Sequence, residues 1–247
     1  MHRSKLMDQY MEQLLQGRRK QCRSLVRGAL EHGTKPESLY FDLMWPAMEE
    51  VEQLYRDDRI NIATEHMATR INRFVADQVQ GNLEDAEPNG KRIVVTCADG
   101  ELEELGAQMC TDLFEAEGWE AYFLGGGVPN DEILSLVGQI RPEILLIYGM
   151  KPQGVPGARA VIDLIRDVGV NPTMNILVSG GVFNRAPDLW KEINADLFAE
   201  SARDALKVAD EALPRVPEVR IPGAPKKRRR RRKSPLLLEA SAITSGR

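Results

Sequence analysis

Apolar residues recur at intervals of three and four along the first eighty residues, the spacing that lines one face of an α-helix. The stretches with this spacing are residues 4–30, 38–55 and 60–79. His32-Gly33 supplies a stop after the first of them, and Pro46 is expected near a helix start or a kink. Four or so helices joined by short turns predict a small helical bundle over residues 1–80.

Beyond residue 91, short apolar runs alternate with helical patterns. The expected strands are residues 92–97, 120–124, 144–148, 175–178 and 197–199, and a last helix is expected over 202–213. This alternation predicts an α/β domain, residues 92–215, with a five-stranded parallel sheet covered by helices on both faces. The polar, aperiodic residues 81–91 read as a linker between the two domains.

One β-α-β unit, residues 92–129, contains the clearest candidate for a ligand site. Asp99 to Gly106 follow its first strand and Gly125 to Gly127 follow its second, so both segments meet at the carboxyl edge of the sheet. Bare glycine amides can cradle an anion. The acids on the neighbouring loop repel phosphate, and no GK[ST] or G-x-G-x-x-G follows, which argues against a nucleotide.

Composition and charge narrow the class of protein. Apolar residues make up 43% and no run approaches the roughly 20 residues that span a bilayer, so a cytoplasmic globular protein is expected. The widely spaced Cys22, Cys97 and Cys110 form neither a disulfide framework nor a zinc pattern, and we expect them to be small buried residues. No hydrolytic motif is present, so a non-catalytic protein is predicted.

A basic run near the C-terminus stands apart from an acidic body. Lys226 to Lys233 are eight consecutive basic residues, and removing them from the net charge of -4 leaves about -12. The prolines around them predict disorder over residues 216–247. Such a run binds polyanions, and nucleic acid, an acidic membrane surface and the acidic body itself remain alternatives.

The segment Gly100-Glu101-Leu102-Glu103-Glu104-Leu105-Gly106, followed by Ala116 to Trp119 and Phe123 to Gly125, resembles the cobalamin-binding domain family. The likeness is closest to MerR-type photoreceptors and to the corrinoid proteins of methyltransferases. It covers nearly all of residues 4–213. It implies a helical cap bundle followed by a flavodoxin-like domain with strand order 2-1-3-4-5.

The resemblance also shows where this chain departs from the family. In that family an acid-x-His-x-x-Gly loop inserts its His under the cobalt and displaces the cofactor's own base into a channel beside the sheet. Here the acid is Glu101 and the glycine is Gly106, but Glu103 stands at the His position. A carboxylate suits cobalt(III) less well than an imidazole, so a His-ligated corrinoid with a displaced base is not expected.

Two strand ends complete the implied site. The family's small residues at the end of strand three, which contact the displaced base, are replaced by Tyr148, which is large enough to fill part of the channel. Ser179-Gly180-Gly181 keeps the family's glycine pair after strand four, where a flat ligand or tail approaches the backbone. An ordinary strand-to-helix turn explains that pair equally well.

In the bundle, the photoreceptor branch has a Trp separated by nine residues from a Glu-His pair, matched here by Tyr55, Glu65 and His66. These residues would cover the upper face of the corrin ring, and Gly125 and Gly126 at the edge of the sheet are further candidate cofactor-binding residues. The resemblance makes His66 a candidate axial cobalt ligand oriented by Glu65. A hydrogen-bonded packing histidine is the alternative.

Taken together, these observations predict a sensor or regulatory module, of the kind used in transcription regulation, that holds a cobalamin or another tetrapyrrole between bundle and sheet. Self-association or a regulator protein would then be its output. A corrinoid carrier that shuttles methyl groups between methyltransferases is the first alternative. A ligand-free scaffold acting through its basic tail is the second.

Overall fold

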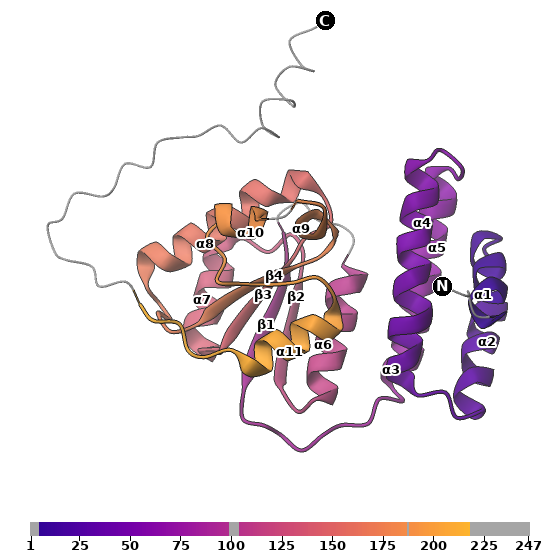
Figure 1. Ribbon diagram of the computed structural model, residues 1–247, viewed down its shortest axis with the longest axis horizontal. Helices are drawn as coiled ribbons and strands as arrows, with labels where there is room; N and C mark the ends of the chain where they lie inside the picture. The colour runs from indigo at the N-terminus through magenta and orange to yellow at the C-terminus, as the bar shows by residue number, and fades with distance from the viewer. Residues whose placement is uncertain (1–4, 99–103, 187, 218–247) are drawn as a thin grey trace, which may run out of the picture. The chain divides into compact units, whose positions relative to one another are not determined.

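The computed structural model describes residues 5–98, 104–186 and 188–217 of the chain (Figure 1). Glu101, Glu103 and the basic run Lys226 to Lys233 lie outside these ranges. The described residues up to Val216 belong to one packed unit. Among them, every helix is too short or too polar to cross a lipid bilayer.

The N-terminal part is a helical bundle, as predicted. Its elements are α1 (Lys5–Leu15), α2 (Arg19–Glu31), α3 (Pro36–Leu39), the π-helical turn η1 (Tyr40–Met44), α4 (Trp45–Arg56) and α5 (Ile62–Gln80). Helix α5 packs against α1, α2 and α4 (Figure 1). Tyr10, Leu14, Val26 and Val75 are fully buried between these helices, so the apolar stripe seen in the sequence is the bundle core.

Pro46 lies in the first turn of α4, directly after the π-turn η1. Proline has no N–H to donate to the carbonyl four residues earlier, so the ladder of hydrogen bonds must change there. The Trp45 N–H donates to the carbonyl of Tyr40, five residues back. Helix α4 begins at Trp45, in agreement with the helix start or kink predicted near Pro46, and the wider π-turn precedes it.

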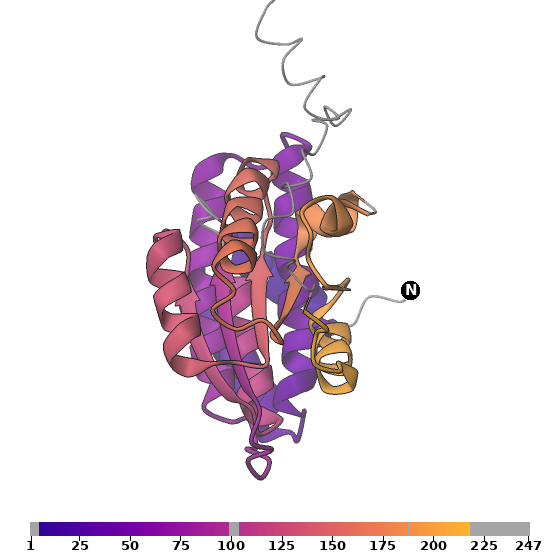
Figure 2. The ribbon, with the colours of Figure 1, turned by 90° about the vertical axis from the view of Figure 1, so that its left-hand side faces the viewer.

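The second part is an α/β fold built on a parallel sheet. Its strands are β1 (Arg92–Cys97), β2 (Glu120–Gly125), β3 (Ile144–Tyr148), β4 (Asn175–Ser179) and β5 (Leu197–Ala199), in the order β2-β1-β3-β4-β5 (Figure 2). Each strand begins and ends within one residue of its prediction. The fold class and the implied strand order are confirmed.

Helices cover both faces of this sheet (Figure 1). They are α6 (Leu105–Ala116), α7 (Asn130–Ile140), α8 (Val155–Val168), α9 (Gly181–Arg185), α10 (Leu189–Glu192) and α11 (Ala202–Glu211), with a 3-10 turn η2 (Pro152–Gly154) before α8. Alternate residues of β3 point to opposite faces. Ile144, Leu146 and Tyr148 share a core with α6, α11 and the bundle, whereas Leu145 and Ile147 share one with α7 and α8.

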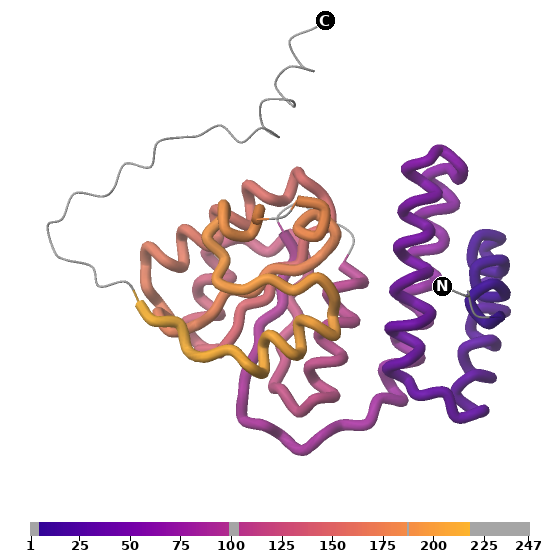
Figure 3. Tube along the Cα trace, in the orientation of Figure 1, coloured from indigo at the N-terminus to yellow at the C-terminus, as the bar shows by residue number. Residues whose placement is uncertain are grey.

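Residues 81–91 connect α5 to β1 without regular structure (Figure 3). The connection is hydrogen-bonded along the end of α6, because the Ala86 N–H donates to the Ala116 carbonyl at 2.8 Å and the Asn89 N–H to the Gly118 carbonyl at 2.9 Å. A Cβ on Gly118 would lie 2.3 Å from the carbonyl oxygen of Glu87. The segment therefore lies tightly against the α/β domain.

Candidate functional site

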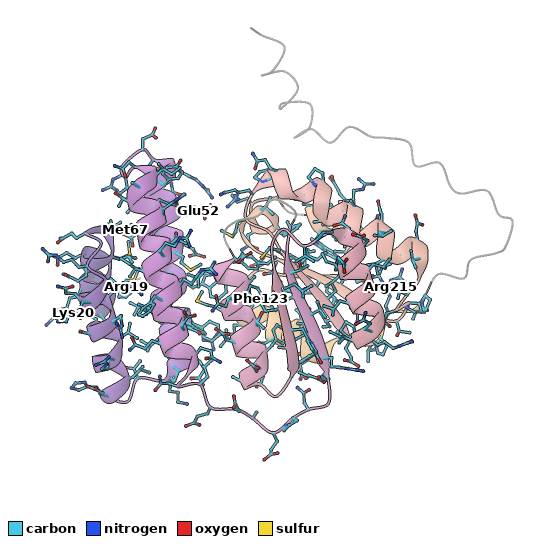
Figure 4. The ribbon with its side chains drawn as sticks, turned by 180° about the vertical axis from the view of Figure 1, so that it is seen from behind. Arg19, Lys20, Glu52, Met67, Phe123 and Arg215 are labelled. Carbon is cyan, nitrogen blue, oxygen red and sulfur yellow. The ribbon has the colours of Figure 1, made fainter. Side chains whose placement is uncertain are left out.

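A cavity of about 280 Å³ lies where the bundle meets the carboxyl ends of the strands. Its bundle wall includes Trp45, Met48, Glu49 and Glu52 of α4 and Glu65 of α5, and its α/β wall includes Gly106, Tyr148, Met150, Gly180, Gly181 and Arg185. Figure 4 shows Glu52 on the face of the bundle opposite α2, which carries Arg19 and Lys20. The carboxyl edge of a parallel sheet is where ligands bind in open α/β folds.

Half of the predicted site residues meet at this cavity. They are Glu65, Gly106, Tyr148, Ser179, Gly180 and Gly181. Tyr55 and His66 are not part of its lining, and their exposed fractions are 39% for Tyr55 and 67% for the His66 side chain. The structure thus brings Glu65, rather than His66, to the cavity. Among the described residues, no three His, Cys, Asp or Glu side chains cluster in a way that could hold a metal ion.

Tyr148 fills the space between the end of β3 and the first turn of α6. Its side chain is 3% exposed, and a Cβ on Gly106 would lie 2.2 Å from the Tyr148 hydroxyl oxygen. Only a glycine at position 106 therefore leaves room for the phenol. Burial, followed by the nearby Cys110 and Cys97 thiols, raises the Tyr148 pKa well above its usual value, so the phenol is neutral.

Gly180 and Gly181, after β4, are needed for the geometry of the backbone turn itself. Gly180 has φ +104°, and a Cβ there would lie 2.3 Å from the carbonyl oxygen of Gly149. The Gly181 N–H donates to the sulfur of Met150 at 3.3 Å, and the Ser179 hydroxyl donates to the Ala199 carbonyl at 2.9 Å. These contacts favour the strand-to-helix turn as the reason for the pair, although both glycines also line the cavity.

Gly125 and Gly126 lie beside a carboxylate of the chain itself. Glu104 Oε1 accepts a hydrogen bond from the Gly126 N–H at 2.7 Å, and a Cβ on Gly125 would lie 2.8 Å from the same oxygen. On its other side, Glu104 Oε2 lies 3.7 Å from Arg73 Nη1 of α5. The predicted anion cradle thus holds an internal anion, a partner that the order of residues along the chain did not reveal.

Glu52 on the cavity wall takes part in two ion pairs, one with Arg56 of α4 and one with Arg185 of α9. Arg185 Nη1 of α9 lies 3.6 Å from Glu52 Oε1 of α4, and Arg185 also donates to the Met150 carbonyl. Burial, and then the charge of Glu52, raise the pKa of Glu49. Glu52 and Arg185 were missed in the sequence because polar residues on a helix surface show no pattern that separates a cavity wall from solvent.

A buried polar contact, whose residues do not line the cavity, joins the bundle to α6. The Tyr40 hydroxyl donates to Asp112 Oδ2 at 2.7 Å and lies 3.2 Å from the Ala76 carbonyl oxygen. Asp112 is 9% exposed. Burial raises its pKa to about 6, although the hydrogen bond from Tyr40 lowers it. Gln108 Nε2 also donates across the junction, to Asp77 Oδ1 at 3.0 Å.

Comparison with known proteins agrees with this geometry. Two family models, both described as B12 binding domain, match residues 6–79 and 91–209. Dimethylamine corrinoid protein 1 of Methanosarcina acetivorans is 24% identical over 138 residues, which are 53% of this chain and 63% of that protein. The match thus spans less than two thirds of that relative's length.

Two further proteins extend the likeness. The methanol–corrinoid protein of Methanosarcina barkeri is 26% identical over 186 residues, 75% of this chain and 70% of that protein. The structure of the Methanosarcina barkeri monomethylamine corrinoid protein superposes with a TM-score of 0.72 at 20% identity, covering 83% of this chain and 96% of that one. With both of its parts matched by B12-binding models, the chain belongs to the cobalamin-binding domain family, whose ligand is a corrinoid.

Proposed function

We propose that this chain is a corrinoid-binding carrier protein for methyl transfer, itself without catalytic activity. The relatives reported above are named as corrinoid proteins of dimethylamine and methanol, and the similar fold is that of a monomethylamine corrinoid protein. These names favour the carrier over the sensor expected from the sequence. They give no support to a role in transcription regulation or nucleic-acid binding.

The cavity between bundle and sheet is the observation that carries the proposal. Trp45 and Met48 give its bundle wall an apolar surface, and Glu49 and Glu52 add carboxyl groups. The rim of a corrin ring bears carboxamide groups, which are hydrogen-bond donors and acceptors suited to such a wall. The donor set therefore fits the upper face and edge of a corrinoid.

A corrinoid requires the bundle to move outward. The cavity of about 280 Å³ lies just below the roughly 300–1,000 Å³ usual for pockets that hold much smaller ligands. The ion pairs that join bundle and α/β domain, Arg73 with Glu104 and Arg185 with Glu52, are partly exposed. Such pairs contribute about 0–1 kcal/mol each, so they oppose little an opening at the cavity that leaves the shared apolar core and the Tyr40–Asp112 contact closed.

The residues that line the cavity would have different roles in such a carrier. Exchange of a methyl group at cobalt is the chemistry that the corrinoid supplies when it is bound. Glu49 and Glu52 would hold the ring through its carboxamide groups, Trp45 and Met48 would exclude water, and the glycines after β4 would leave room for it at the sheet. Separate methyltransferases would then act on the exposed side of the closed unit.

Uptake of a corrinoid by the purified full chain tests the proposal. After incubation with hydroxocobalamin and desalting, corrin absorbance is expected to remain with the protein at about one per chain. Glu52→Gln should lower the affinity by about tenfold, because an ionised acceptor at the rim is lost. Glu31→Gln, on an exposed residue at the end of α2, is the matched control and should change nothing.

A colourless protein after desalting rejects the carrier. A light-dependent change in oligomer size with bound methylcobalamin would instead favour the sensor, because a methyl carrier does not need a light response.

A further inference from the structure

The end of β3 separates the cavity from the interior of the α/β domain. Tyr148 pairs with Cys97 of β1 on one side and with Ser179 of β4 on the other. Its side chain projects toward α6, because it shares a core with α6 and not with α7 or α8. A flat group entering from the cavity between the sheet and α6 would therefore meet the Tyr148 ring first.

The space behind that ring is filled by the chain itself. Gly106 lies against the phenol so closely that a Cβ would reach 2.2 Å from the hydroxyl oxygen and 2.5 Å from the ring carbon that bears it. The buried thiols of Cys97 and Cys110 lie near the same side chain. Protein interiors packed in this way admit no further aromatic group without losing the one already present.

Two residues of this chain depart from the pattern of the family, Tyr148 at the end of β3 and Glu103 at the position of the family's histidine. Displacement of a corrinoid's base requires a ligand that replaces it at the cobalt, and Glu103 stands where the family has that histidine. Without that histidine the base stays on the cobalt of the bound corrinoid unless a water molecule takes its place there. Tyr148 occupies the place that would otherwise stay empty, so the two substitutions are complementary.

We propose that Tyr148 sets the corrinoid selectivity of this chain: the ring binds in the cavity while the nucleotide tail stays outside the α/β domain and adds no affinity. The proposal rests on the proposed function, because it concerns how the same cavity recognises its ligand. Corrinoids that lack the nucleotide tail should therefore bind as well as complete cobalamin does.

Binding of two ligands to the full chain tests this inference. Cobinamide has the corrin ring without the nucleotide tail, and hydroxocobalamin has both. Equilibrium dialysis read by visible absorbance should give dissociation constants within about threefold of each other for the wild type. Tyr148→Phe keeps the ring and is the matched control, so its ratio should stay the same.

Tyr148→Ser removes the ring and opens the space beside Gly106. Its affinity for cobalamin should rise about tenfold or more, because a base that gives up its place on the cobalt to water can then be buried there, while its affinity for cobinamide should stay unchanged. If this variant fails to fold, as a melting curve will show, the ratios of the wild type and of Tyr148→Phe still decide.

Three results would overturn the inference. The first is a wild type that binds cobalamin at least tenfold tighter than cobinamide. The second is a folded Tyr148→Ser variant that strengthens both ligands equally or neither. The third is a wild type that binds neither corrinoid, and this result alone also rejects the proposed function.

Discussion

At the scale of single residues, the carboxyl group of Asp112 is unusual because it is buried between the bundle and α6. It receives a hydrogen bond from Tyr40, which lies 72 positions earlier and belongs to the bundle. Burial raises the pKa of Asp112 to about 6 and also raises that of Tyr40 well above its usual value. Both groups are therefore most stable when uncharged.

This environment predicts a pH-dependent stability. The Asp112 pKa is about 6 in the folded chain and about 3.9 in an unfolded one, so the folded chain binds the proton more tightly. Its contribution is fully present below about pH 4 and is lost as the pH rises toward 6, by up to roughly 3 kcal/mol. Urea unfolding at pH 4 to 7 measures it.

The matched variant is Asp112→Asn, which keeps an acceptor for the Tyr40 hydroxyl and does not titrate. The difference in unfolding free energy between the two proteins should change between pH 4 and 6 and then level off. A difference that is flat across this range would contradict the raised pKa.

At the scale of elements, the contact of α6 with β3 passes through Gly106 and Tyr148. A glycine inside a helix normally costs about 0.5–1 kcal/mol relative to alanine. Here the sign should reverse, because the added Cβ would collide with a buried ring. The fit of these two elements thus depends on one residue without a side chain.

Gly106→Ala should lower the unfolding free energy by roughly 1–3 kcal/mol, the usual cost of overpacking a core. In a Tyr148→Ser background the same change should be neutral or stabilising, because the obstacle is gone. Urea unfolding of the four proteins in this double-mutant cycle measures the coupling. Equal effects in both backgrounds would show that the two side chains do not meet.

The elements themselves were largely predictable from the sequence. Strands such as β3 are short, wholly apolar runs, and the helices of the bundle repeat at three and four residues, so local pattern and burial agree. The start of α5 was placed two residues early, because Asn61 caps the helix by accepting from the Thr64 N–H at 2.9 Å. Near Pro46 the sequence predicted a helix start or a kink, and the π-turn itself was not predicted.

The site was less predictable, because it depends on how a helix is turned. Neighbouring residues on a helix differ by about 100° in direction, and that difference brings Glu65 to the cavity while His66 stays largely exposed. Strand ends are easier, since the carboxyl edge of a parallel sheet collects them wherever they lie in the chain. The family resemblance named Tyr148 and Ser179 to Gly181, which lie at such strand ends and line the cavity, whereas Arg185 was not predicted.

At the scale of the whole described unit, bundle and α/β domain share one apolar core and several polar links. Glu104 is the link that touches three elements, because it receives the Gly126 N–H after β2, faces Arg73 of α5 and precedes α6. Removing it affects the loop and the bundle contact together.

Two variants of this residue separate those roles. Glu104→Ala leaves the Gly126 N–H without its acceptor and should cost about 1 kcal/mol or more. Glu104→Gln keeps the acceptor and loses only the charge toward Arg73, so it should cost less than about 1 kcal/mol, as Arg73→Ala should. Thermal melting of the three variants measures this, and an Ala variant no worse than Arg73→Ala would contradict the role of the loop contact.

The way residues 81–91 are attached restricts how the bundle can swing. Asn82 and Leu83 are tied back to the end of α5, and Ala86 and Asn89 are tied to the end of α6 and the turn after it. Glu84 and Asp85 lie between these two anchors. For the corrinoid entry proposed above, the bundle would therefore rotate about that dipeptide, at the amino end of the sheet. This rotation would open the cavity most at its glycine-lined side, at the carboxyl edge of the sheet. The same connection would guide the bundle back to its starting position when the cavity closes.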